Sequence, residues 1–185
     1  ILSIVLPMVA AMVFCGCKTV STPAHSNFSR FVGVENFSKF SRSPDENGVT
    51  VLLSPEIKAH IPWNELIVSW NAAAPAGTFL KIEAAAISAG HQTKFYTLGD
   101  WSPDNAVFPR TSVPDQRDAE GNVDTDTLIL KQTGDAAQIR VTLGGTNGQL
   151  PTLQFLGLSF SNTKIPVAGG PPNHGRLLGR LLGWL

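Results

Sequence analysis

Acidic side chains are concentrated in one stretch in the middle of the chain, where they could bind a metal ion. The stretch contains Asp115, Asp118, Glu120, Asp124 and Asp126. Calcium prefers several oxygen ligands, and a glycine within the same stretch permits the sharp turn that gathers them. One hypothesis is therefore calcium ligation by Asp115, Asp118, Asp124 and Asp126, but we favour the alternative below. The alternative is a solvated loop whose acids pair with neighbouring arginines, because the spacing does not match an EF-hand.

Aromatic rings near polar side chains indicate a second kind of site, one that binds a glycan or a peptide. Flat indole rings offer apolar faces on which a sugar can stack, while charged and amide groups bond its hydroxyls. Trp63 and Trp101 are the candidate rings, and Arg110 is the candidate polar partner. The alternative is that both indoles fill the core, as we expect for Trp70, or cover a sheet edge.

The chemistry of a catalytic centre is missing from most of the chain. Both cysteines, Cys15 and Cys17, lie at its beginning, so the later residues offer no thiolate nucleophile or thiolate metal ligand. The four histidines are far apart in sequence, and there is no Gly-x-Ser-x-Gly motif. We therefore expect no catalytic residues and no cofactor other than calcium. A hydrolase that uses two carboxylates is the alternative.

The charge balance excludes one class of partner. Lys plus Arg and Asp plus Glu both number 14, so the formal net charge is zero. Such a chain lacks the basic surface that nucleic acid binding requires. With 43% hydrophobic and 15% charged residues it can bury a core, and we expect one ordinary domain that is monomeric.

The first residues have the pattern of an export signal. Residues 1–16 form an apolar run whose length is typical of a signal peptide and short for a membrane span. Phe14-Cys15-Gly16-Cys17 resembles a bacterial lipobox, in which a small residue precedes the lipidated cysteine. We predict a signal peptide and lipobox at 1–17, lipidation of Cys17, and a tether at 18–47. An ordinary cleaved signal is the alternative; either one predicts export, to the periplasm, the outer membrane or the medium.

The elements that hold these residues are predicted to be short strands, from the alternation of apolar and polar residues along the chain. Residues 65–71 and 138–143 alternate with the two-residue period of a strand, which points Ile139 and Val141 inward and Arg140 outward. Further strands are expected at 48–57, 78–88, 93–101, 123–130 and 153–160. Strands at this spacing, separated by turns, predict an all-β fold over 48–163, an antiparallel two-sheet β-sandwich of the jelly-roll type.

The end of the chain has a different composition. Residues 164–185 are expected to form a Pro/Gly linker and an apolar tail. The leucines and arginines of 176–185 fit a membrane-surface helix, although each glycine within it costs about 1 kcal/mol relative to alanine. The alternative, which we favour, is a truncated or out-of-frame tail.

Several segments, taken together and in order, resemble a known family. They are WNELIVSWNAAAPAGTFLKIEAAA, TKFYTLGDWS, RTSVPDQRDAEGNVDTDTLIL, RVTL and LQFLGLS. They are similar to the N-terminal β-domain of exported bacterial cysteine peptidases of the thirty-ninth family, the bacteriocin-processing type with a papain-like catalytic domain. The resemblance covers 63–162. A papain-like mechanism needs a thiolate and a histidine, yet after Ile165 the chain has no cysteine and His174 alone as a base.

The resemblance therefore implies an accessory domain without its enzyme. We expect a non-catalytic exported domain that sits N-terminal to a cysteine-peptidase domain and serves positioning, or substrate or glycan binding, at the cell envelope. One alternative is a free-standing envelope lipoprotein with a structural or carbohydrate-binding role, and another is a β-sandwich hydrolase. Exposure of Trp63 or Trp101 would favour glycan binding, and burial of both would favour a structural spacer.

Overall fold

The computed structural model describes residues 28–43, 48–110, 113–146 and 148–165. The predicted signal peptide, the lipidation site Cys17 and nearly all of the predicted tail lie outside the described residues. Across the described part of the chain, no helix has the length and apolar character needed to cross a membrane.

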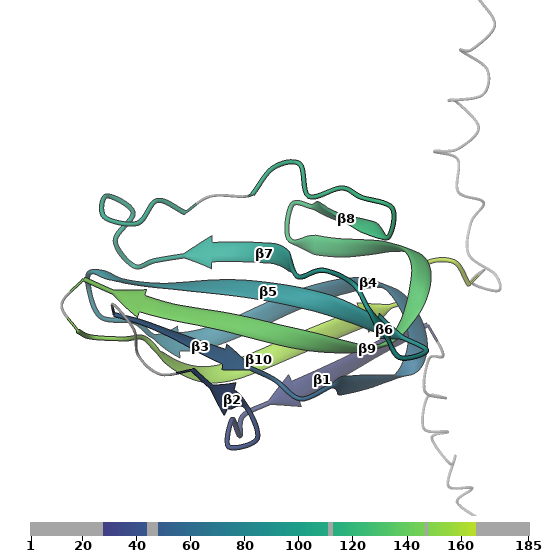
Figure 1. Ribbon diagram of the computed structural model, residues 1–185, viewed down its shortest axis with the longest axis horizontal. Coiled ribbons are helices and arrows are strands. Elements are labelled where there is room, and N and C mark those ends of the chain that lie inside the picture. Colours follow the sequence, from purple (N-terminus) through teal and green to yellow (C-terminus); the bar gives the residue numbers. More distant parts are fainter. Residues whose placement is uncertain (1–27, 44–47, 111–112, 147, 166–185) are drawn as a thin grey trace, which may run out of the picture.

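Every regular element in the described residues is a β-strand, and the strands pair antiparallel throughout (Figure 1). They are β1 (Ser29–Val34), β2 (Ser41–Arg42), β3 (Val49–Leu53), β4 (Ile57–Ala73), β5 (Thr78–Ser88), β6 (His91–Gln92), β7 (Tyr96–Trp101), β8 (Gly121–Asp124), β9 (Thr127–Gly145) and β10 (Thr152–Ser161). The predicted all-β, antiparallel class is confirmed.

The strands belong to one curled sheet, in the order β1-β10-β4-β9-β3-β2, with β5 and β8 also paired to β9. Strands β4 and β9 are long and bend together: Trp63 lies opposite Gly134, between two stretches of regular pairing. In β4 the bend contains His60, whose φ is 59°, and Pro62, which has no N–H for a ladder. The separation into two sheets that a jelly roll requires is not confirmed, because all ten strands of the described residues belong to one hydrogen-bonded sheet.

One hydrophobic core fills the inside of the curl, and alternation along the strands supplies it. Leu80, Ile82 and Ala84 of β5 are fully buried, and they face Ile139 and Val141 of β9, which are also fully buried. Strands β4 and β10 add the remaining large side chains, such as Leu66, Leu156, Leu158 and Phe160. The predicted inward positions of Ile139 and Val141 are confirmed.

Two boundaries differ from the sequence prediction. Residues 123–130 and 138–143 do not form separate strands, since β8 and the single long strand β9 meet at a tight turn between Asp124 and Thr127. The described part of the predicted tether, 18–47, includes β1 and β2, and β1 pairs along its whole length with β10. The inward positions of β1, Val32 and Val34, pack against the core, but the serines around them hide this short alternation in the sequence.

Candidate functional site

A cavity of about 580 Å³ opens beside the bend of β9. Its volume lies in the range of small-ligand pockets. The β5–β6 hairpin forms one wall, and residues 119–120 and the middle of β9 form the others. The described lining residues are Ala86, Ser88, Ala89, His91, Thr93, Ala119, Glu120, Leu130, Lys131, Gln132, Thr133 and Gly134. Ala86, Leu130 and Gly134 are buried and form an apolar floor.

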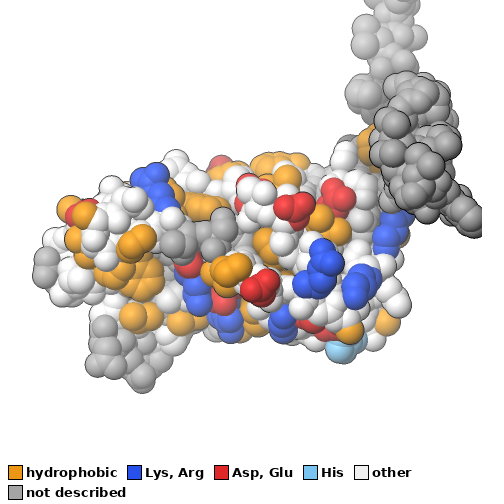
Figure 2. Space-filling model, turned by 90° about the horizontal axis from the view of Figure 1, so that it is seen from above, with side chains coloured by type: hydrophobic (Ala, Val, Ile, Leu, Met, Phe, Trp, Pro, Cys, Tyr) orange, Lys and Arg blue, Asp and Glu red, His pale blue; other side chains and the backbone are white. Residues whose placement is uncertain are grey.

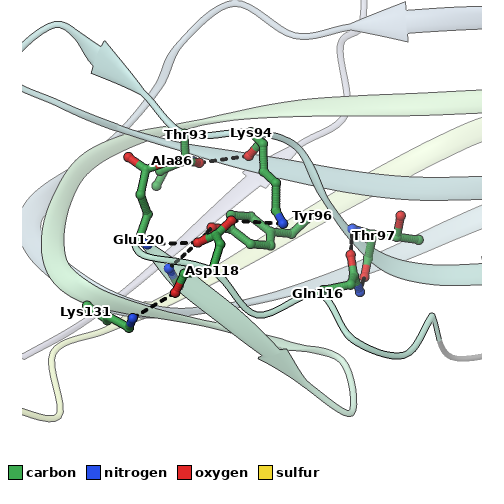
Figure 3. Close-up of polar contacts among 10 residues, drawn as sticks. Ala86, Thr93, Lys94, Tyr96, Thr97, Gln116, Asp118, Glu120 and Lys131 are labelled. Atoms are coloured by element: carbon green, nitrogen blue, oxygen red, sulfur yellow. Dashed lines mark hydrogen bonds and ion pairs between the residues drawn. The ribbon is translucent and has the colours of Figure 1, made fainter.

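The wall at residues 118–121 is held by one carboxylate, that of Asp118 (Figure 3). Its Oδ1 accepts hydrogen bonds from the Tyr96 hydroxyl at 2.8 Å and from the backbone N–H groups of Glu120 at 2.8 Å and Gly121 at 3.0 Å. Its Oδ2 lies 2.9 Å from the Lys94 ammonium. The sequence prediction singled out Asp118 as a metal ligand, but the structure gives it the role of a loop anchor.

The electrostatics of this anchor follow from those contacts. Burial alone would raise the pKa of Asp118, but the hydrogen bonds from Lys94, Gly121, Tyr96 and Glu120 outweigh it and hold the pKa below its usual range. Burial, together with the hydrogen bond to the Asp118 carboxylate, raises the pKa of Tyr96. Tyr96 therefore stays a neutral donor and Asp118 a charged acceptor.

The four predicted calcium ligands are not gathered into one site. Asp118 is used by the anchor, Asp115 and Asp124 are exposed, and Asp126 accepts the Thr127 hydroxyl at 3.3 Å. Among the residues that the structure describes, no three His, Cys, Asp or Glu side chains are grouped so that they could hold a metal ion. Calcium binding by this stretch stays a prediction, one that would require the loop to rearrange.

One acid of the same stretch forms a bridge across the cavity mouth. Glu120 Oε1 lies 2.5 Å from His91 Nε2 of the β5–β6 hairpin, so the two walls are joined by a side-chain contact. On the third wall, the Lys131 ammonium donates to the Asp118 carbonyl at 2.8 Å. The mouth therefore presents charges of both signs.

A separate groove of about 300 Å³ contains the aromatic candidates, and it is lined by Trp70, Asn71, Ala72 and Trp101. Trp101, as predicted, lies beside Arg110, whose guanidinium carbon is 5.2 Å from the ring centroid. The Arg110 Nε donates to the Ser102 carbonyl at 2.9 Å, which orients the guanidinium over the ring. Two indoles, a fixed guanidinium and an exposed amide thus meet at one surface.

The other predicted ring, Trp63, is fully buried, so the prediction that it binds a ligand is wrong and it is a core residue. Its ring packs 5.1 Å from that of Phe160 at the bend of β4. Trp70, which we expected in the core, packs against it but is only partly buried and lines the groove. Gly99 of β7 lies against its indole. A Cβ at Gly99 would lie 2.8 Å from the Trp70 indole, so this glycine lets the ring reach the groove.

A buried charge cluster on the outer side of β5 was not predicted. The Glu83 carboxylate accepts two hydrogen bonds from the Arg140 guanidinium, at 2.7 and 2.8 Å, and its side chain is only 6% exposed. Burial would raise its pKa, but Arg140 and Lys81 outweigh this effect and lower it. Burial raises the pKa of Asp100. The charge of Glu83 raises this pKa further, and the charge of Lys81 lowers it without cancelling the effect of burial. None of the cavities described here is lined by Glu83 or Asp100.

The face that carries β7 and β8 has no surface of one charge sign (Figure 2). Acidic and basic side chains are interspersed across it, as expected for a chain of zero net charge. The sequence pointed to Trp101, Arg110 and Asp118, but missed Trp70, the cavity and the Glu83–Arg140 pair. Only the cross-strand register brings those groups together, and a single sequence does not reveal it.

Comparison with known proteins identifies the family. No curated protein and no solved structure is significantly similar to the chain. A family described as Peptidase C39 N-terminal domain matches residues 35–161. The match spans all the strands from β2 to β10, and the resemblance found in the sequence is therefore confirmed. The chain belongs to the family of N-terminal domains of C39 peptidases.

Proposed function

We propose that this chain is a non-catalytic accessory domain that holds glycan at the cell envelope for a cysteine peptidase. The family match supports the accessory role, because residues 35–161 contain no cysteine and so cannot provide a thiolate nucleophile. We further propose that the domain is exported and anchored through a lipid on Cys17.

The groove between Trp70 and Trp101 carries the glycan part of the proposal. Both rings are partly exposed, which leaves apolar faces free for stacking on a sugar. The Arg110 guanidinium and the Asn71 amide stand ready to bond hydroxyls at the rim. An apolar platform with a few oriented polar groups is the usual composition of a small-ligand site.

Binding of chitohexaose to the full chain tests this proposal. We expect millimolar or tighter affinity in a calorimetric titration, and Trp101→Ala should weaken it at least tenfold. Phe31→Ala is the matched control, because Phe31 is an exposed aromatic residue, 57% exposed, on a different strand. No binding by the unmodified protein, or equal binding by the Trp101→Ala variant, would refute the glycan proposal.

Export and lipidation need their own experiment. Mass spectrometry of the protein from the membrane fraction of a bacterial host should show a lipid-modified Cys17 after expression with a complete signal sequence. The Cys17→Ser variant should move to the soluble fraction. Unmodified cysteine in membrane-free protein would contradict the anchor but leave the accessory role untouched.

A structural spacer is the second candidate; of the two rings whose burial would favour it, Trp63 is fully buried and Trp101 is only partly buried. A spacer would bind no sugar, so the same titration separates the two. The hydrolase alternative receives less support. The Glu83 carboxylate is occupied by Arg140, and its lowered pKa makes it a poor proton donor at neutral pH.

A further inference from the structure

The cavity beside β9 lies at a gap in the pairing of that strand. Residues 127–130 of β9 pair with β8, and residues 136–145 pair with β5. Between them, residues 131–133 have no strand partner on either side in the described part of the chain. The cavity is lined by these same residues.

The backbone in the gap is only partly used. The N–H of Lys131 donates to the Glu120 carbonyl at 2.8 Å, and the Lys131 carbonyl accepts from the Lys164 ammonium at 2.5 Å. Thr133 also lines the cavity and has no strand partner in the described part of the chain. An unpaired stretch of strand edge is a template for another extended chain.

One buried polar group behind the floor of the cavity lacks a hydrogen-bond partner. The Nε1 of Trp63 is buried, and no hydrogen-bond acceptor for it exists among the described residues. A Cβ on Gly134 would lie 3.1–3.3 Å from the edge of this indole, so the indole edge stands directly behind the glycine of the floor. A buried N–H without an acceptor is rare in native proteins, but Trp63 is fully buried and does not line the cavity, so this group does not face a ligand there.

We propose that this cavity binds a short extended peptide. The peptide backbone would pair with β9 at Thr133, in the manner of an added strand, and one apolar side chain would rest on Ala86 and Leu130. A sugar fits less well, because the described lining contains no Phe, Tyr or Trp ring for stacking. This peptide site does not depend on the glycan proposal, since it uses none of the groove residues.

Selection of a phage-displayed library of random hexapeptides on the full chain tests the proposal. We expect enriched peptides that share an apolar residue at one fixed position. A synthetic copy of an enriched peptide should bind in fluorescence anisotropy. It should also slow hydrogen exchange at the Thr133 amide.

Two variants locate the binding. Ala119 is exposed and lines the cavity, so Ala119→Trp should fill the site without disturbing the core and weaken the peptide at least tenfold. Ala76→Trp places the same ring on an exposed turn elsewhere and should leave binding unchanged. Trp101→Ala should also leave it unchanged, which separates this site from the glycan groove. Failure to enrich any peptide, or equal binding by the Ala119→Trp variant, would overturn the proposal.

Discussion

The two halves of β9 are held in place by different physical means. Residues 136–145 pair with β5 on one side; on the other side residues 136–137 pair with β4 and residues 140–144 with β3. Their inward side chains are buried in the core. Residues 127–135 have shorter pairings, a cavity on one side, and a neighbouring loop held by the polar contacts of Asp118. Strand pairing on both sides therefore holds residues 136–145, whereas a few oriented hydrogen bonds hold the loop that borders the half where we place a ligand.

The largest effect is expected from charging the buried half. Val141→Asp would put an unpaired carboxylate at a fully buried position, and we expect a loss of at least about 4 kcal/mol in the free energy of unfolding. Such a loss approaches the whole stability of many domains. Urea denaturation followed by circular dichroism measures it. Thr142→Asp, which faces outward and pairs with Lys81, is the control and should lose far less.

A smaller but still substantial effect is expected on the outer side of the same half. Arg140→Ala leaves the buried Glu83 carboxylate without its guanidinium partner, and we expect a loss of about 2–3 kcal/mol. The partial exposure of Arg140 keeps this below the loss for a fully buried pair. A double-mutant cycle with Glu83→Gln should show coupling between the two residues. Independent, additive losses would contradict the pairing.

These two variants also show what the sequence reveals. The two-residue period placed Ile139 and Val141 inward and Arg140 outward, and all three positions are confirmed. Alternation alone also predicts that Arg140→Asp is mild. The register contradicts that expectation, because it brings Arg140 next to Glu83, and a second carboxylate there would repel the first.

The aromatic residues teach the same lesson about the candidate site. The sequence marks Trp63 and Trp101 equally as candidate stacking rings. The bend of β4 buries Trp63, whereas Trp101 at the end of β7 lines a groove. The strand period identifies which face a residue is on, but the curl of the sheet decides which faces are closed. The cavity beside β9 depends on where β5 stops and β8 begins, so no local pattern predicts it.

In the loop that borders residues 127–135 of β9, removal of the Asp118 charge should have a moderate effect on stability. Asp118→Asn keeps the shape but loses the ionic contact with Lys94 and weakens the bonds from Tyr96 and the backbone. We expect a loss of about 1–2 kcal/mol at neutral pH, measured by urea denaturation. Asp124→Asn is the matched control, since Asp124 is an exposed acid of the neighbouring hairpin, and its effect should stay within about 0.5 kcal/mol.

The same variant has a pH signature with a defined sign. Because the folded state lowers the pKa of Asp118, this group adds stability above the ordinary aspartate pKa of about 4. That contribution is lost as the pH falls below this value, where protonation is easier in the unfolded chain. The stability difference between the unmodified protein and Asp118→Asn should therefore shrink as the pH falls from roughly 5 to roughly 2. A difference independent of pH would argue against a charged anchor.

The smallest effect should come from the hydroxyl that completes the anchor. Tyr96→Phe keeps the ring in the core, where Tyr96 is fully buried, and removes only the donor to Asp118. We expect a loss of about 1 kcal/mol, because Asp118 retains Lys94 and two backbone donors. In the Asp118→Asn background the loss should fall, since the bond to a neutral amide oxygen is weaker. If Tyr96→Phe costs the same in both backgrounds, the loss does not come from the hydrogen bond to Asp118. Packing would then contribute more to residues 118–135 than the polar contacts imply.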